Sequence, residues 1–267
     1  MAQSTDYMLT STVECERLER QADLHGRSRV LEHITPAPGM RFLDAGSGSG
    51  WVSRLVAATF PECEVVGVDL NPEYVEYAAG RAKADGLTNL TYEQGDLQSL
   101  RFVDKSFDVI WSQFVLYFLP DPQAALVEFL RIVKPGGQVV TALHQLPGVA
   151  SPFGTDAQVR MNRFISDILS GFRCETLPQL YRSAGYLGIS LDVQLDRIYS
   201  KIAGPIDAAH RRNLEDVLTG PMQRMADTLG GPDSATALLG DWIAFLARED
   251  STYVSTYWIA KGSAPGG

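Results

Sequence analysis

The stretch Leu43-Asp44-Ala45-Gly46-Ser47-Gly48-Ser49-Gly50 decides the fold of this chain. It follows a short apolar run at residues 40–43 and precedes a helical pattern over residues 51–59. Glycine adopts backbone angles that other residues avoid, and without a Cβ it lets a backbone come close to a ligand. Ligands bind at the carboxyl ends of strands in open α/β sheets, so these glycines stand where a binding site is expected.

Strands and helices alternate from this turn onward. Asn71-Pro72 and Asp121-Pro122 each predict a helix start, because Asn and Asp cap helices and Pro fits the first turn. Lys134-Pro135-Gly136-Gly137 is expected to end the second of these helices. Further strands are predicted at 64–68, 90–93, 107–111 and 138–143. This alternation favours a mostly parallel sheet with helices on both faces.

Beyond His144 the pattern changes. Helical segments are expected over 156–169, 176–183, 206–229 and 234–247, and strands over 189–198 and 252–261. We expect the helical segments to form a cap over a pocket.

Asp69 is the acidic residue that follows the second strand. It lies about 20 residues beyond the glycine turn, where a carboxylate grips the hydroxyls of a ribose. A carboxylate there would repel a 2′-phosphate, so an adenosine-containing ligand is favoured over NADP. The G-x-G-x-G spacing also differs from the G-x-G-x-x-G of dinucleotide enzymes.

Four motifs in order resemble the core of the class I S-adenosylmethionine-dependent methyltransferases. They are Leu43 to Gly50, Val66-Gly67-Val68-Asp69, Gln94-Gly95-Asp96-Leu97 and Lys134-Pro135-Gly136-Gly137. The resemblance spans Arg41 to Leu143. It implies an α/β, Rossmann-like fold with a seven-stranded sheet, S-adenosylmethionine as cofactor and S-adenosylhomocysteine as product.

The resemblance also implies roles for individual residues. The glycine turn would approach the methionine part of the cofactor, Asp69 would hold the ribose, and Asp96 would meet the adenine amino group. Ser112 and Gln113, at the end of the fourth strand, would face the cofactor's amino group or the methyl. The complete set of predicted cofactor-binding residues is Tyr7, Asp44, Gly46, Ser47, Gly48, Gly50, Asp69, Leu70, Asn71, Gly95, Asp96, Leu97, Ser112 and Gln113.

Near the start of the chain, Tyr7-Met8-Leu9 is followed by Glu16-Arg17-Leu18-Glu19-Arg20-Gln21. These two stretches resemble a subgroup of bacterial and fungal small-molecule methyltransferases. In that subgroup the N-terminal segment folds over the cofactor, which makes Tyr7 and Gln21 candidate lid contacts. The alternative is an amphipathic helix packed on the sheet with Tyr7 exposed. We therefore expect a helical lid segment at residues 1–35 and a methyltransferase domain at 36–267. Its cap insertions would lie at about 147–186 and 204–248.

His144 is the candidate general base. It follows the fifth strand, so its imidazole is expected to point toward the transferred methyl; the alternative is a structural residue at a strand end. Catechol-type methyltransferases place metal-binding acids after the fourth and fifth strands. Ser112 and His144 stand at those ends here, so we expect no catalytic metal.

Composition narrows the partners of this 267-residue chain. Its net charge of -9 and the lack of a basic cluster argue against nucleic acid. It has no apolar stretch long enough to span a bilayer, and its three isolated cysteines predict a cytoplasmic protein. The acceptor is expected to be a small molecule, such as a natural product, and the oligomeric state is not readable. Two alternatives stay open: a non-methylating protein of the same fold, and an NAD-dependent oxidoreductase.

Overall fold

The computed structural model describes residues 12–25, 27–145, 172–199, 231–246 and 253–266, and the single positions 159–161, 163, 208, 212 and 226. The chain forms two compact units. The sheet unit consists of residues 18–145, 172–194 and 257–267, and the second unit of 1–17, 146–171 and 195–256. The glycine turn and every strand-end residue singled out above belong to the sheet unit.

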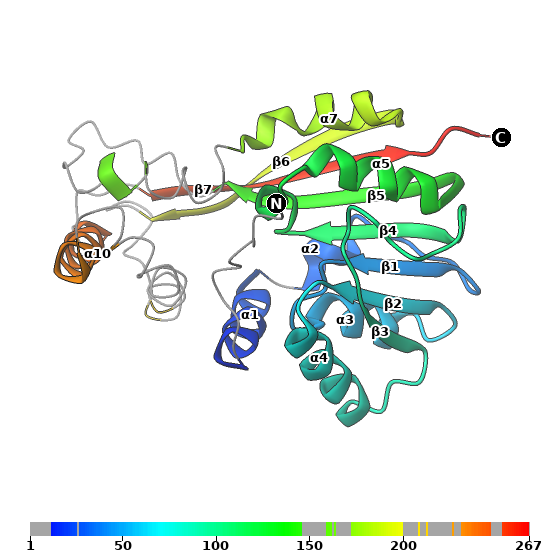
Figure 1. Ribbon diagram of the computed structural model, residues 1–267, viewed down its shortest axis with the longest axis horizontal. Coiled ribbons are helices and arrows are strands. Elements are labelled where there is room, and N and C mark those ends of the chain that lie inside the picture. Colours follow the sequence, from blue (N-terminus) through cyan, green and yellow to red (C-terminus); the bar gives the residue numbers. More distant parts are fainter. Residues whose placement is uncertain are drawn as a thin grey trace, which may run out of the picture. The chain divides into compact units, whose positions relative to one another are not determined.

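Seven strands form one sheet in the order β3-β2-β1-β4-β5-β7-β6 (Figure 1). Their bounds are β1 Arg41–Ala45, β2 Glu64–Asp69, β3 Leu90–Gln94, β4 Phe107–Gln113, β5 Val133–Gln145, β6 Leu187–Tyr199 and β7 Tyr253–Ser263. Neighbouring strands among β1 to β5 pair in parallel, whereas the arrow of β7 points the other way in Figure 1. The predicted mostly parallel, Rossmann-like sheet is thus confirmed. The strand order turns back at β1, which lies between β2 and β4, and ligands of such sheets bind beside this reversal.

Helices connect most of the strands. They are α1 Thr12–His25, α2 Arg27–Leu31, α3 Trp51–Thr59, α4 Pro72–Ala84, α5 Pro122–Ile132, α7 Leu177–Ala184 and α10 Pro232–Leu246, with short 3-10 turns η1 Leu116–Phe118 and η2 Cys174–Thr176. The two predicted caps are confirmed. Oδ1 of Asn71 accepts from the Glu73 amide at 2.9 Å, and Oδ1 of Asp121 accepts from the Ala124 amide at 3.0 Å. Each bond satisfies an amide that the helix leaves without a partner.

The sheet is covered on both faces because its strands are apolar on both sides. Phe42, Val65 and Val109 share one core cluster with buried residues of α2 and α3. Their neighbours along the strands are also buried and point to the other face, since side chains alternate along a strand. That face carries α5 and α7. The Tyr181 hydroxyl of α7 donates to Oγ1 of Thr141 in β5 at 3.1 Å.

Residues 172–186 are predicted to be part of the cap, but the structure places them on the sheet. They belong to the sheet unit, with Tyr181 and Tyr186 buried, and the Tyr186 hydroxyl donates to the Leu126 carbonyl of α5 at 2.9 Å. An amphipathic helix has the same sequence pattern whether it caps a pocket or covers a sheet, so periodicity did not separate the two. Most of the remaining predicted cap lies outside the described residues. α10 belongs to the second unit, where Leu238 and Trp242 are buried.

The segment Lys134–Gly137 also differs from expectation. It was predicted to separate a helix from a strand, but β5 already begins at Val133, which pairs with Phe107. The register then shifts, and Gln138 pairs with Val109. The glycine-containing segment is therefore an irregularity within the strand. A Cβ on Gly137 would lie 2.8 Å from the Asp108 carbonyl, which explains the need for glycine there.

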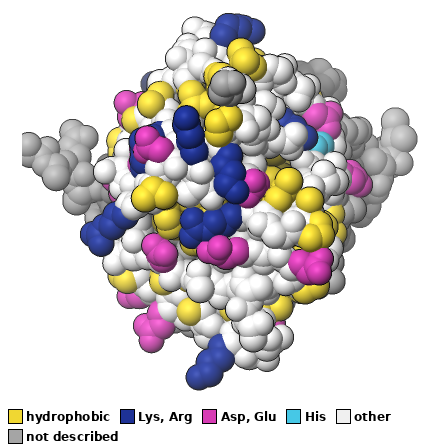
Figure 2. Space-filling view, turned by 90° about the vertical axis from the view of Figure 1, so that its right-hand side faces the viewer, with side chains coloured by type: hydrophobic (Ala, Val, Ile, Leu, Met, Phe, Trp, Pro, Cys, Tyr) yellow, Lys and Arg dark blue, Asp and Glu magenta, His cyan; other side chains and the backbone are white. Residues whose placement is uncertain are grey.

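Charged residues at the amino ends of the parallel strands are paired. Nε of Arg41 lies 2.8 Å from the Glu64 carboxylate, and Nζ of Lys134 lies 2.7 Å from that of Asp108. Figure 2 shows this end of the molecule, where basic and acidic side chains alternate over the surface. Ligands of open α/β sheets bind at the opposite, carboxyl ends of the strands. In the part of the chain that the structure describes, no helix is both long and apolar enough to cross a membrane.

Candidate active site

The glycine turn has the backbone that its sequence predicts. Gly46, Gly48 and Gly50 have φ values of 82°, 53° and 77°, all in the left-handed region that favours glycine. A Cβ on Gly46 would lie 2.3 Å from Cγ2 of Val115, and one on Gly50 would lie 2.3 Å from the Tyr92 hydroxyl oxygen. Glycine is therefore required in this turn both by the backbone angles and by the close packing of neighbouring side chains.

Asp69 reaches from the end of β2 to this turn. Its Oδ2 accepts a hydrogen bond from the Gly48 amide at 2.8 Å, and its Oδ1 accepts one from the Asn71 amide at 3.0 Å. The side chain is buried, and burial raises the pKa of the carboxyl. The structure thus brings together the two features that the sequence separated by about 20 residues.

Asp44 points into the protein. Its Oδ2 accepts from both the amide and the hydroxyl of Ser53, at 3.0 and 2.5 Å. Only 2% of the residue is exposed, and burial raises its pKa to about 7. In this structure Asp44 ties β1 to the first turn of α3, and its predicted contact with a cofactor stays a prediction.

The residues predicted to surround an adenine follow β2 and β3. In the sheet, β3 and the turn after β1 lie on opposite sides of β2. The Gly95 amide donates to the Asp69 carbonyl at 3.0 Å, which places Asp96 next to the end of β2. Leu70 is 53% exposed, whereas Leu97 is only 5% exposed and packs inward. The Asn71 side chain is engaged as the cap of α4. Asp96 itself is exposed, and its Oδ1 accepts from the Gln98 amide at 2.9 Å.

Three predicted residues carry buried polar atoms that have no hydrogen-bond partner among the described residues: Oγ of Ser47, Oγ of Ser112 and Oε1 of Gln113. An unsatisfied buried polar group costs about 1–3 kcal/mol. Ser47 belongs to the turn after β1, and Ser112 and Gln113 end the adjacent strand β4. Their atoms suit a polar ligand at the point where these two strands end.

His144 lies within β5, which extends to Gln145, so it does not follow the strand as predicted. Its half-buried ring packs edge-on against Phe114, with centroids 6.1 Å apart. Phe114 also packs edge-on against Tyr257 at 5.6 Å. Phe114 follows β4 directly and has a φ of 61°, which is rare for a residue with a Cβ. Sequence reasoning missed it, since no residue pattern indicates a left-handed phenylalanine.

Part of the N-terminal segment contacts the glycine turn and α3. The Glu19 carboxylate lies 2.6 Å from Nη2 of Arg54, and the Asp23 carboxylate accepts from the Trp51 indole at 3.1 Å. A Cβ on Gly48 would lie 3.2 Å from Cδ1 of Leu18. Gln21 is half-buried in the same helix, whereas Tyr7 lies outside the described residues.

Arg54 is a buried residue that sequence reasoning missed. Besides Glu19 it contacts the Asp85 carboxylate at 3.0 Å, and its Nη1 donates to the Ser49 carbonyl of the turn at 2.8 Å. A lone arginine in the apolar helix 51–59 was the available signal. It joins α1, the turn and the end of α4.

Residues 43–141 match the family model described as a methyltransferase domain. The matched residues run from β1 into β5, so the similarity to this family covers the parallel half of the sheet. They contain the turn, Asp69, Asp96 and the end of β4, all in the expected order.

Curated relatives are similar over the same part of the chain. A malonyl-(acyl-carrier protein) O-methyltransferase of Erwinia pyrifoliae is 32% identical over 169 residues, covering 61% of this chain and 57% of the relative. A demethylmenaquinone methyltransferase of Staphylococcus aureus is 36% identical over 115 residues, covering 43% and 47%. The chain thus spans about half the length of these relatives.

Solved structures are similar over most of the chain. The cyclase SpnF has a TM-score of 0.59 and 24% identity, covering 92% of this chain and 82% of SpnF. A Haemonchus contortus phosphoethanolamine N-methyltransferase, solved with S-adenosyl-L-methionine, has a TM-score of 0.64 and 16% identity, covering 99% and 60%. At these identities the likeness shows the fold alone.

Proposed function

We propose that this protein transfers a methyl group from S-adenosylmethionine to a small-molecule acceptor. One observation carries the proposal: the buried Asp69 carboxylate at the end of β2 meets the amide of Gly48 in a turn of left-handed glycines. A carboxylate at this place suits the paired hydroxyls of a ribose, and a turn of glycines, which lack a Cβ, lets the backbone come close to the rest of a nucleoside ligand. The methyltransferase family match over residues 43–141 supports the same reading.

The residues present fit this cofactor. The buried hydroxyls of Ser47 and Ser112 and the Gln113 amide oxygen need polar partners that the described chain does not supply. In the proposed complex they face the amino-acid part of the cofactor, Asp69 accepts from the ribose hydroxyls, and Asp96 accepts from the adenine amino group. Gly46, Gly48, Gly50 and Gly95 supply backbone, and Leu70, Asn71 and Leu97 flank the base. Asp44 fixes the end of the turn by accepting a hydrogen bond from the Ser53 amide in α3.

The chemical demands on the protein are modest. When bound, the cofactor supplies a methyl group on a cationic sulfur, which is electrophilic without further activation. The chain's own part is to align the acceptor and exclude water. His144 is proposed to take a proton from a hydroxyl or carboxylic acid acceptor, with its ring held by Phe114. No catalytic metal is part of this proposal.

The acceptor class rests on the relatives. The names of the two relatives given above refer to malonyl-(acyl-carrier protein) and to demethylmenaquinone. We infer that the acceptor of this protein is a small organic molecule or a small group attached to a carrier protein. Nucleic acid is not proposed, given the net charge of -9.

Two measurements test the proposal. Calorimetry should show binding of S-adenosylhomocysteine and no comparable binding of NAD, which would exclude the oxidoreductase alternative. Incubation with S-adenosylmethionine and fractionated metabolites should release S-adenosylhomocysteine when the acceptor is present. Conversion of an acceptor without that release would favour the non-methylating alternative, and failure to bind S-adenosylhomocysteine would overturn the proposal.

A further inference from the structure

The connection from β3 to β4 contains no helix. Residues 95–106 run as an irregular segment in which the backbone of Asp96 is bonded only within a short turn: the Ser99 amide donates to the Asp96 carbonyl at 3.0 Å, and the two residues form an isolated bridge. The Asp96 carboxylate engages its own turn, because Oδ1 accepts from the Gln98 amide at 2.9 Å and from the Gln98 side chain at 3.4 Å. No described residue donates to Oδ2 of Asp96. The position of this turn relative to the sheet then depends on the contacts of residues 98–102.

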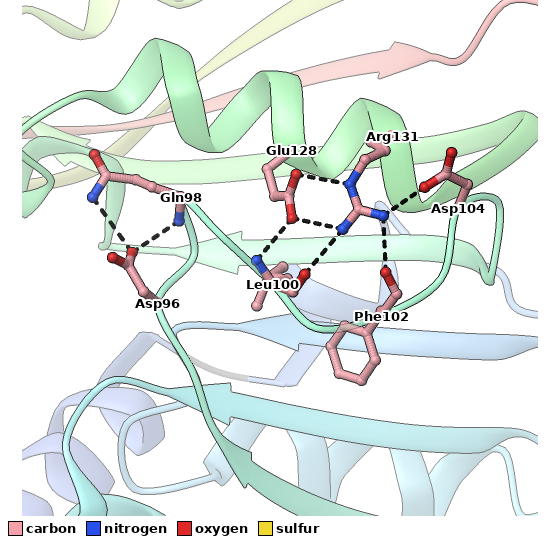
Figure 3. A network of polar contacts seen from close by, with 7 residues as sticks. All are labelled: Asp96, Gln98, Leu100, Phe102, Asp104, Glu128 and Arg131. Atoms are coloured by element: carbon pink, nitrogen blue, oxygen red, sulfur yellow. Dashed lines mark hydrogen bonds and ion pairs between the residues drawn. The ribbon is translucent and has the colours of Figure 1, made fainter.

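Helix α5 contacts the segment at two places, and Figure 3 shows the second of them, at Glu128 and Arg131. Near the start of the helix, the Asp121 amide donates to Oε1 of Gln98 at 3.1 Å. Near its end, Nη2 of Arg131 donates to the Leu100 carbonyl at 3.0 Å and Nη1 donates to the Phe102 carbonyl at 2.8 Å. One guanidinium thus bonds two carbonyls of a segment that lacks secondary structure.

Glu128 completes the arrangement. Its carboxylate accepts from Nε and Nη2 of Arg131 at 2.9 and 2.7 Å, and also from the Leu100 amide at 2.7 Å. Glu128 is 15% exposed and Arg131 33% exposed at the side chain, and Arg131 holds the pKa of the Glu128 carboxyl below its usual range. Leu100 therefore has both its amide and its carbonyl bonded to this pair. Asp104 also meets Arg131, at 2.6 Å, but it is 69% exposed and contributes little.

We infer that Arg131 and Glu128 are positioning residues for base recognition: by fixing the Leu100 and Phe102 backbone, they hold Asp96 where it can accept from the adenine amino group. The inference rests on the proposed function, which supplies the adenine. Neither residue lies at a strand end or in a binding motif. Their effect passes through the backbone of residues 97–102 to Asp96.

The test compares two ligands by calorimetry. S-adenosylhomocysteine carries the adenine amino group, whereas S-inosylhomocysteine has a carbonyl oxygen in its place. A positioned carboxylate accepts from the first and repels the second, so the wild-type protein should prefer S-adenosylhomocysteine by roughly 10- to 100-fold. Asp96→Asn should reduce this ratio and serves as the reference for its loss.

The positioning variants are Arg131→Ala and Glu128→Gln. Each should bring the ratio to within about threefold of one, chiefly by weakening S-adenosylhomocysteine, whereas Arg131→Lys should be intermediate because it has one donor group in place of a fork. Asp104→Asn is the matched control, since it removes the exposed partner alone, and it should keep the wild-type ratio. If Arg131→Ala does not fold, Glu128→Gln and Arg131→Lys supply the same measurement.

A purely structural role would predict a different result. Both ligands would then weaken equally and the ratio would stay at its wild-type value, which would overturn the inference while leaving the proposed function intact. Failure of the wild-type protein to bind S-adenosylhomocysteine at all would overturn both. A wild-type protein that binds both ligands equally would overturn the role of Asp96, and the inference with it.

Discussion

The amide of Gly48 donates a 2.8 Å hydrogen bond to Oδ2 of Asp69, which joins the turn after β1 to the end of β2 at one buried carboxylate. The bond lies at the point where the strand order turns back, so it brings the two best sequence signals into one place. The turn and the carboxylate can be tested separately, because Gly86 and Glu62 supply control substitutions for Gly48 and Asp69.

Replacing the carboxylate should weaken cofactor binding. We expect Asp69→Ala to reduce S-adenosylhomocysteine affinity by about 2–4 kcal/mol, because two charge-assisted hydrogen bonds to the ribose are lost. Calorimetry measures this loss, and circular dichroism checks that the variant is folded. Glu62→Ala removes an exposed carboxylate in the turn before β2, and this variant should bind as the wild type does. Normal affinity in a folded Asp69→Ala protein would remove Asp69 from the proposed site.

The glycine turn is tested by a pair of valine substitutions. Gly48 and Gly86 both have positive φ values, 53° and 71°, so a valine at either costs about 1–2 kcal/mol in backbone strain. A Cβ on Gly48 approaches Leu18, whereas one on Gly86 meets nothing within 4 Å. We expect similar losses of thermal stability, but only Gly48→Val should abolish binding of S-adenosylhomocysteine. Equal binding by both variants would show that the turn does not approach the ligand.

Asp44 should make the protein less stable as the pH rises from about 4 to 7. Burial raises its pKa to about 7 in the folded protein, so between these values the folded state holds a proton that the unfolded state has released. The free energy of unfolding then falls by on the order of 1 kcal/mol per pH unit and levels off above pH 7. Burial shifts the Asp69 pKa in the same direction.

Urea unfolding of the wild type and Asp44→Asn at several pH values measures this dependence. The asparagine cannot ionise, so its profile should be flatter than that of the wild type over the same range. Asp69→Ala in the same series separates the contribution of the second buried carboxyl. A wild-type stability that rises between pH 4 and 7, and does so equally in Asp44→Asn, would contradict the assigned pKa.

His144 is tested through turnover. If its imidazole takes the acceptor's proton, His144→Ala should lower kcat by roughly 10²- to 10⁴-fold while cofactor affinity stays near wild type. The pH profile of kcat should also change in the variant, because the group that takes the proton contributes one limb of that profile. His33→Gln is the control, since His33 contacts Gln194 and Asp192 and is not one of the residues of the proposed site. Near-normal turnover with an unchanged profile would leave His144 as a packing partner of Phe114.

Local patterns determined much of this protein. The glycine turn, the capped starts of α4 and α5, the parallel strands and the acid after β2 all follow from residues within a few positions of one another. Glycines with positive φ and helix caps are local in their physics, because their hydrogen bonds and backbone angles involve near neighbours. For this reason the sequence alone predicts Asp69 and the glycine turn.

Tertiary structure decided what depends on residues distant in the sequence. The left-handed Phe114 beside His144 and Tyr257, and the bonds of Arg131 to the Leu100 and Phe102 carbonyls, join segments far apart along the chain. The same is true of residues 172–186, which cover the sheet although their pattern also fitted a cap. A side chain's sequence neighbours set which helix or strand it occupies, but its partner depends on how those elements pack.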